Sequence, residues 1–305
     1  TVSSRGVYKF PVEDKKSTKY EDHQCSSYDV EACSWSNIPD EDFALADDNH
    51  WTIGQFVWTG FDYLGEPSPY DTNAWPNHSS MFGIIDLASI PKDRYYLYRS
   101  VWNKKAETLH ILPHWTWPGR EGKVTPVFVY TNHPTAELFI NGKSYGKQSK
   151  NNSSLKNRYR LMWMDAIYEP GEIKVVAYNK DGKAVAEKIV RTAGKPHHIE
   201  LVSNRNELTA DGKDLAYITV KVVDKDGNLC PADSRQINFS VKGAGKYRAA
   251  ANGDPTNLEQ FHLPKMHTFN GMLTAIVQSG ETAGEIVLTA KASGVKAGNI
   301  RIQTK

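Results

Sequence analysis

The sequence is poor in cysteine and lacks long apolar runs. Its 305 residues include only Cys25, Cys33 and Cys230, too few for a dense disulfide framework, although Cys25 and Cys33 could pair across their short loop in an oxidising compartment. No apolar stretch approaches the roughly 18 to 20 residues of a membrane-spanning helix, so we predict no membrane span. The first residues lack the charged and apolar regions of a signal peptide. Since residue 1 need not be the native start, secretion stays open.

An excess of charge of one sign is also missing. The 37 lysines and arginines nearly balance the 35 aspartates and glutamates, and no basic run is present, so the sequence argues against a nucleic-acid partner. A hydrophobic fraction of 39% with 24% charged residues is typical of a soluble globular protein. The length allows two or three domains with ample cores.

Common catalytic and metal-binding patterns are absent as well. We find no glycine-rich phosphate loop and no convincing Ser/His/Asp arrangement. His197 and His198 are adjacent, so both rings cannot easily reach one ion from a strand. We interpret them as an exposed linker pair and predict no metal site.

Tryptophan divides the chain, because seven of the eight lie at or before residue 117. In the tryptophan-rich part, a proline and early carboxylates predict a short helix over residues 37–46. Tyr95, Tyr98 and Trp102 recur at helical spacing and predict a second helix over 92–102.

Between these helices lies the most informative stretch, residues 54–67, GQFVWTGFDYLGEP. Its apolar centre is too short for a helix and is bracketed by Gly54 and Gly60, which predicts a buried parallel strand over 54–59. The following loop is dense in aromatic rings and carboxylates, a combination that suits stacking on, and hydrogen bonding to, a sugar. A strand, a functional loop and a covering helix form a β/α unit.

After about residue 110 the sequence becomes short strands separated by turns. Strands are predicted over 124–131, 136–140, 159–164, 172–178 and 184–190, with hairpin signals at residues 141–142 and 181–182. This spacing predicts an immunoglobulin-like sandwich over 111–193. Residues 194–196 are a plausible linker. Further strands, predicted over 199–202, 216–223, 237–241 and 286–290, indicate a second sandwich over 194–305, with residues 243–272 left unplaced.

Three segments together identify a resemblance to a known family. Residues 54–67, 79–87 (SSMFGIIDL) and 91–98 (PKDRYYLY) resemble the end of the catalytic barrel in glycoside hydrolase family 2 β-galactosidases, particularly those of Bacteroides-type bacteria. The two sandwiches resemble the accessory domains of those enzymes. The LTADG segment at 208–212 makes the last one similar to invasin-type modules.

The resemblance implies a fold and a mechanism. Residues 1–110 correspond to the C-terminal part of a (β/α)₈ TIM barrel, with 54–59 as its eighth strand and the active site at the carboxyl face. The implied mechanism is retaining, with two glutamates about 5 to 5.5 Å apart and a glycosyl-enzyme intermediate. Residues 1–8 resemble the segment after the nucleophile, so both catalytic glutamates are expected upstream. We therefore assign no catalytic residue here and expect the chain alone to be inactive.

Six residues are candidates for binding the sugar. The resemblance makes Trp58 the floor of the subsite for the terminal sugar; its alternative is a barrel core residue. Asp62 and Glu66 either hydrogen-bond sugar hydroxyls or cap and stiffen their loop, and as an acid/base pair they lack an enforced separation. Tyr28 and Asp29 are expected to approach the pocket from the loop after the seventh strand. The ring of Phe82 either edges the pocket or packs beneath it.

The leading hypothesis is therefore the C-terminal segment of a retaining exo-β-galactosidase, with a β-galactoside as substrate and the N-terminal remainder of the enzyme as partner. The alternatives are a non-catalytic accessory or carbohydrate-binding module, or a β-glucuronidase or β-mannosidase. Glucuronidases of the family usually place an asparagine and a lysine before the glycine after strand eight, and residues 77–83 lack that lysine.

No cofactor is expected to be required, although family members often use magnesium or sodium. The resemblance also implies a periplasmic or secreted location and allows a homo-oligomer.

Overall fold

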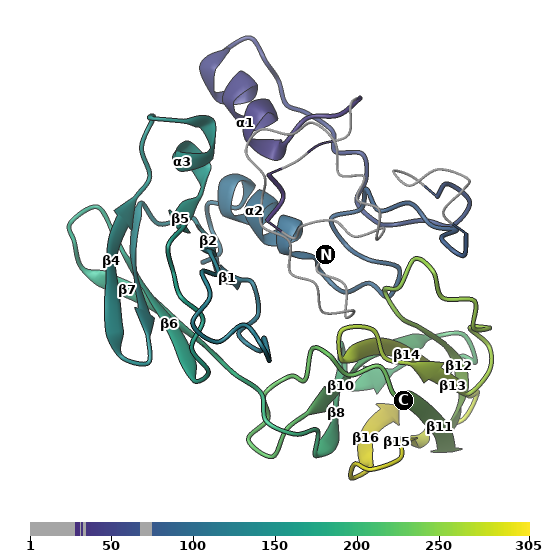
Figure 1. Ribbon diagram of the computed structural model, residues 1–305. Coiled ribbons are helices and arrows are strands. Elements are labelled where there is room, and N and C mark those ends of the chain that lie inside the picture. The colour runs from purple at the N-terminus through teal and green to yellow at the C-terminus, as the bar shows by residue number, and fades with distance from the viewer. Residues whose placement is uncertain (1–27, 31, 33–34, 68–74) are drawn as a thin grey trace.

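The computed structural model describes residues 28–30, 32, 35–67 and 75–305 (Figure 1). The predictions for Cys25, Cys33 and residues 1–8 lie outside these residues. Helix is scarce in the described part, and no helix there is long and apolar enough to cross a membrane. The helices are α1 (Pro39–Asp48), α2 (Asp93–Trp102) and the single-turn α3 (Leu155–Tyr159). The rest of the regular structure is β-strand, and the sandwich part of the predicted fold class is confirmed.

The first pair of sheets follows α2 directly. A three-stranded sheet has the order β1-β2-β5 and a four-stranded sheet the order β4-β3-β6-β7. Alternate residues of β3 and β6 are buried, as expected for strands with one face on a core. Asn141 and Gly142 both have positive φ, so the predicted hairpin turn is confirmed. The strands are β1 (Leu109–Leu112), β2 (Val127–Thr131), β3 (Thr135–Ile140), β4 (Lys143–Ser149), β5 (Leu161–Trp163), β6 (Glu172–Tyr178) and β7 (Ala184–Arg191).

The second pair of sheets has a separate core. Its sheets have the orders β12-β14-β10-β8 and β13-β11-β15-β16-β9. The segment that the sequence left unplaced contains β12 and β13, and a long loop connects them. The strands are β8 (His198–Ser203), β9 (Glu207–Leu208), β10 (Leu215–Val223), β11 (Gln236–Gly243), β12 (Gly245–Ala251), β13 (Lys265–His267), β14 (Met272–Ser279), β15 (Gly284–Lys291) and β16 (Gly298–Thr304).

The two long helices share the first core instead of forming one of their own. Phe43 of α1 and Leu97 of α2 are buried in the same cluster as the residues of β2 and β6. The guanidinium of Arg160, fully buried, reinforces this junction: its Nε donates to Asp40 Oδ1 of α1 at 2.8 Å. The division into domains at residue 110 stays a prediction, and this core includes residues on both sides of it.

The predicted buried strand over residues 54–59 is wrong. No strand is formed there, Phe56 is fully exposed, and Trp58 is 73% exposed. A parallel strand is buried only between neighbouring strands and under covering helices. In the described part of the chain, the main-chain hydrogen bonds of Thr59 and Gly60 all go to residues 82–85, on one side of the segment. Ile84 N–H donates to Thr59 O at 3.1 Å and Ile85 N–H to Gly60 O at 3.0 Å.

Candidate functional site

The loop that follows Trp58 is fixed at its base by Asp62. This carboxylate is 7% exposed and accepts hydrogen bonds from Gly83 N–H and Lys92 Nζ, each at 2.8 Å. Burial raises the pKa of Asp62, although the Lys92 ammonium opposes that rise. Since both carboxylate oxygens contact Lys92, Asp62 acts as a positioning residue for the loop. The second of its two predicted roles, stiffening the loop, is the one that this geometry supports.

Gly83 is required for the same contact. A Cβ atom at this position would lie 2.1 Å from the backbone nitrogen of Asp62 and 2.6 Å from the carbonyl oxygen of Ile85. No side chain fits in that space, so the loop carrying Asp62 and the segment carrying Gly83 approach as closely as backbones can.

Trp58, Tyr63 and Glu66 form a connected cluster at the surface of the loop. Trp58 Nε1 donates to Tyr63 Oη at 3.2 Å, and the two rings meet edge to face with centroids 6.1 Å apart. The Tyr63 hydroxyl in turn donates to Glu66 Oε2. The hydrogen bond to Glu66 raises the pKa of Tyr63, so the phenol stays protonated at neutral pH. The cluster presents a fixed aromatic face beside a carboxylate.

Tyr28 and Asp29 lie elsewhere, beneath the helices. Tyr28 is fully buried, its ring packs on Phe128 at a centroid distance of 4.6 Å, and its hydroxyl donates to Pro126 O. Asp29 accepts from both Arg94 Nε, at 2.8 Å, and the Arg94 terminal nitrogen. Burial would raise the pKa of Asp29, but the Arg94 guanidinium outweighs it and holds that pKa below its usual range. In the described structure neither side chain joins the Trp58 cluster.

Phe82 is half-buried, and its carbonyl accepts from Thr59 N–H at 3.4 Å, which places it beside the end of the Trp58 segment. Asn77 is buried, and its Nδ2 donates to Pro67 O at 3.2 Å. Both residues come from the segment after the loop, and they hold the two ends of the loop through these hydrogen bonds.

The described residues contain no group of three or more His, Cys, Asp or Glu side chains arranged to hold a metal ion. His197 and His198 contact one another, with their Nδ1 atoms 3.0 Å apart. Both are half-buried and His198 begins β8, so the prediction of an exposed linker pair is wrong. Asp62 is buried against Lys92, whereas Glu66 is exposed and bonded to Tyr63. Asp62 and Glu66 share no hydrogen bond, and the geometry gives no acid/base pair in the part of the chain that is described.

Two features of the site carry no clear sequence signal. Lys92 was visible only as a residue at the start of a helix, and nothing in its spacing pointed to Asp62, thirty positions earlier. The hollow between the loop and the last sandwich, lined by Leu64 and Phe261 among others, depends on how distant segments dock. Tyr63, by contrast, belongs to the aromatic loop that the sequence did indicate.

Comparisons with known proteins agree with this architecture. Residues 199–301 match the family described as glycoside hydrolase family 2 C-terminal domain 5, and residues 122–186 match a domain of unknown function (DUF4982). The chain is 41% identical over 313 aligned positions to beta-galactosidase BoGH2A of Bacteroides ovatus, covering 100% of this chain and 35% of that protein. This chain belongs to glycoside hydrolase family 2.

Other relatives extend the comparison. A beta-glucuronidase of Formosa agariphila is 25% identical over 85% of this chain. A solved beta-glycosidase from Bacteroides vulgatus superposes with a TM-score of 0.82 at 34% identity, covering 91% of this chain and 34% of that one. The chain spans about a quarter to a third of the length of these relatives, 35% of the first, 26% of the second and 34% of the solved chain, and corresponds to a C-terminal portion of family 2 proteins. Relatives with two different specificities match it.

Proposed function

We propose that this chain is the C-terminal region of a retaining exo-β-galactosidase, and that its Trp58 loop holds the terminal sugar. The observation that carries the proposal is the exposed ring of Trp58, braced by Tyr63 beside Glu66, in a chain 41% identical throughout to a protein named beta-galactosidase. An apolar sugar face can pack on the indole, while the Glu66 carboxylate accepts from hydroxyl groups. Asp62 and Lys92 keep both in place.

The chemistry itself is assigned to residues outside this chain. In the retaining mechanism one carboxylic acid protonates the leaving oxygen and a second carboxylate attacks the anomeric carbon; water then releases the sugar. We place both glutamates in the upstream part of the enzyme and residues 1–110 in the C-terminal part of its (β/α)₈ barrel. The proposal explains why Phe56 is exposed here, since the upstream part of the barrel would cover it. No metal step is assigned to this chain, because its described residues offer no ligand set.

A neutral sugar is preferred over a uronic acid. The segment before Gly83 carries no lysine, and the buried Asn77 already donates to Pro67 O. Lys92, the cation closest to the loop base, is paired with Asp62 and does not offer a free charge to a substrate carboxylate. On the family resemblance alone we also propose a periplasmic or secreted location.

A substrate panel tests the specificity. The full-length protein containing this chain is assayed with nitrophenyl β-galactoside, β-glucuronide and β-mannoside, and the anomer released first is identified by NMR. We expect the galactoside to be preferred by at least about tenfold in kcat/KM and β-galactose to appear first. A preference for the glucuronide or mannoside, or release of the α-anomer, would overturn the assignment.

A further inference from the structure

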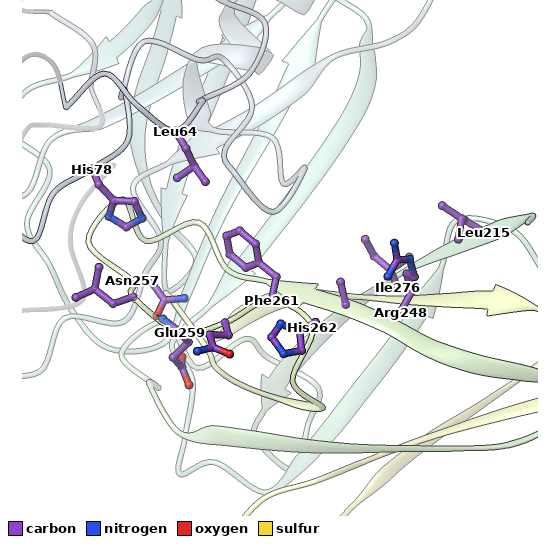
Figure 2. A pocket seen from close by; sticks show the side chains of 12 residues that line it. Leu64, His78, Leu215, Arg248, Asn257, Glu259, Phe261, His262 and Ile276 are labelled. Carbon is purple, nitrogen blue, oxygen red and sulfur yellow. Dashed lines mark hydrogen bonds between the residues drawn. The ribbon is translucent and has the colours of Figure 1, made fainter.

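We propose that a pocket between the Trp58 loop and the last sandwich binds the saccharide that follows the terminal sugar. The pocket has a volume of about 720 Å³, within the range typical of small-molecule sites. Leu64 and His78 line it from the loop side, and Phe261 and His262 from the sandwich side (Figure 2). This inference rests on the proposed function and names the part of the substrate that the last sandwich recognises.

The pocket is joined to the proposed sugar site through adjacent residues. Leu64 directly follows Tyr63, whose hydroxyl accepts from Trp58. Leu64 also forms a β-bridge with Ser79, so its backbone position is fixed relative to the Trp58 cluster. On this proposal, a substrate whose terminal sugar packs on Trp58 extends past Tyr63 to the pocket beside Leu64.

The last sandwich is held against residues 78–88, the segment that follows the Trp58 loop. His78 N–H donates to Pro255 O at 3.1 Å, and Thr274 Oγ1 donates to Ala88 O at 2.6 Å in a buried contact. At Gly253 a Cβ atom would lie 2.0 Å from Asp86 Oδ2, so the two segments meet without room for a side chain. These contacts are independent of any ligand and form the pocket in advance, which lowers the entropic cost of binding.

The wall of the pocket is preformed too. Phe261 O accepts from Ala250 N–H at 2.9 Å, which anchors the β12–β13 loop to β12. Glu259 Oε1 contacts His267 Nδ1 at 2.9 Å, and Glu259 Oε2 accepts from His267 N–H at the same distance. The Phe261 ring, which takes no part in these bonds, is 38% exposed and free to pack on a ligand.

The chemistry of the lining favours a polyhydroxylated ligand. His78 Nδ1 contacts Pro76 O at 2.9 Å, and since a carbonyl only accepts, Nδ1 carries the proton and Nε2 is an acceptor. Within the described part of the chain, the side chains of Arg248, Gln260 and His262 make no hydrogen bond or ion pair. Donors and acceptors left open around an apolar ring are what a saccharide requires.

The test compares a long and a short substrate in the full-length protein. Kcat/KM is measured for a β-galactosyl-terminated tetrasaccharide and for nitrophenyl β-galactoside, and their ratio is followed in Phe261→Ala, Leu258→Ala and Val202→Ala. Leu258 lines the pocket and is 57% exposed; Val202 is a matched exposed aliphatic residue on β8 outside it. We expect the ratio to fall about tenfold in Phe261→Ala and severalfold in Leu258→Ala, and to stay unchanged in Val202→Ala.

The outcomes separate the two proposals. If the nitrophenyl galactoside is cleaved but the ratio does not respond to Phe261→Ala or Leu258→Ala, the pocket assignment is overturned and the proposed function stands. If Val202→Ala lowers the ratio equally, the pocket is likewise rejected. Should Phe261→Ala fail to fold, Leu258→Ala decides, because its side chain is more exposed. If the wild-type protein cleaves no glycoside, both proposals fall.

Discussion

At the scale of single residues, the candidate site separates into side chains that face outward and side chains that hold them. Trp58 is exposed, and within the described residues its side chain is held through its indole nitrogen and the Tyr63 ring. Asp62, two residues beyond the turn at Gly60, is buried and fully engaged by Lys92 and Gly83. The distinction between binding and positioning residues therefore follows from burial, and it determines which substitutions should affect catalysis without affecting folding.

Replacing Trp58 by alanine tests the binding role. In the full-length protein we expect Trp58→Ala to lower kcat/KM for nitrophenyl β-galactoside by about 100-fold, because a misplaced sugar loses alignment with the reacting groups. The melting temperature of the 305-residue chain should change little with the same substitution, since this ring is 73% exposed there. Tyr217→Ala, which removes an exposed ring on β10, should change neither quantity. A loss of activity below threefold for Trp58→Ala would contradict the role.

Asp86 provides a pH-dependent test of the contact between the loop and the last sandwich. Burial raises its pKa to about 6, although Oδ1 accepts from the amides of Ile90 and Ala88. The native state thus binds more protons than the unfolded state between pH 4 and 6, so the free energy of unfolding falls as pH rises through this window. The difference of about two pKa units between the native and unfolded states corresponds to about 3 kcal/mol in the free energy of unfolding.

The variant Asp86→Asn keeps an oxygen that can accept from both amides but cannot ionise. We expect it to lack this component of the pH dependence and to exceed the wild type in stability by up to about 3 kcal/mol above pH 7. Urea unfolding of both proteins from pH 4.5 to 8 measures the difference. If the free energies of unfolding of the two proteins changed with pH in the same way, Asp86 would not be the source of this pH dependence.

At the scale of elements, the helices depend on the first sandwich. Arg160 connects α1 to this sandwich through Asp40 and also donates to the carbonyls of Tyr28, at 2.6 Å, and Asp29, at 2.9 Å. Both members of the Arg160 and Asp40 pair are fully buried. Breaking such a pair leaves an uncompensated charge in the core, which costs far more than the loss of an ion pair at the surface.

The variant Arg160→Met should therefore destabilise the chain by about 3–5 kcal/mol. Its matched control is Arg158→Met, two residues earlier, which breaks a partly exposed pair with Asp48 and should cost less than about 1 kcal/mol. Equilibrium urea unfolding compares the two. Equal losses would show that the buried network does not hold α1 in place.

The sequence predicted most elements but not the state of residues 54–59. Local signals marked the helices over 37–46 and 92–102 and the main strands of both sandwiches. These signals were early carboxylates, the spacing of apolar residues and glycine-containing turns. The strand over 54–59 was predicted from its own composition, yet a parallel strand forms only where neighbours supply hydrogen bonds. Residues 243–272 stayed unplaced because β12 and β13 are separated by a long loop without periodicity.

The candidate site was predicted in part. The aromatic and acidic loop and Trp58 were visible because rings and carboxylates crowd residues 58–66. The partner of Asp62 and the burial of Tyr28 were not, since both depend on contacts between segments distant in the sequence: Tyr28 donates to Pro126, 98 residues away. The pocket beside Leu64 likewise exists only because the last sandwich docks on the loop.

At the scale of the whole molecule, two cores with different roles are joined in one chain. The first core carries the helices that support the Trp58 loop. The second belongs to a sandwich that contacts His78 and Ala88, in the segment that follows this loop and is hydrogen-bonded to it. We infer that the sandwiches buttress the sugar site, and that the last one adds a wall to it. The remaining part of the site, with both catalytic carboxylates, is assigned to the portion of the enzyme upstream.

The most direct test of this account is to compare the 305-residue chain with the full-length protein on nitrophenyl β-galactoside. The account predicts turnover by the full-length protein and none above background by the chain, because the chain supplies a sugar-holding wall without the carboxylates that perform the reaction. Turnover by the purified chain within tenfold of the full-length protein would contradict it.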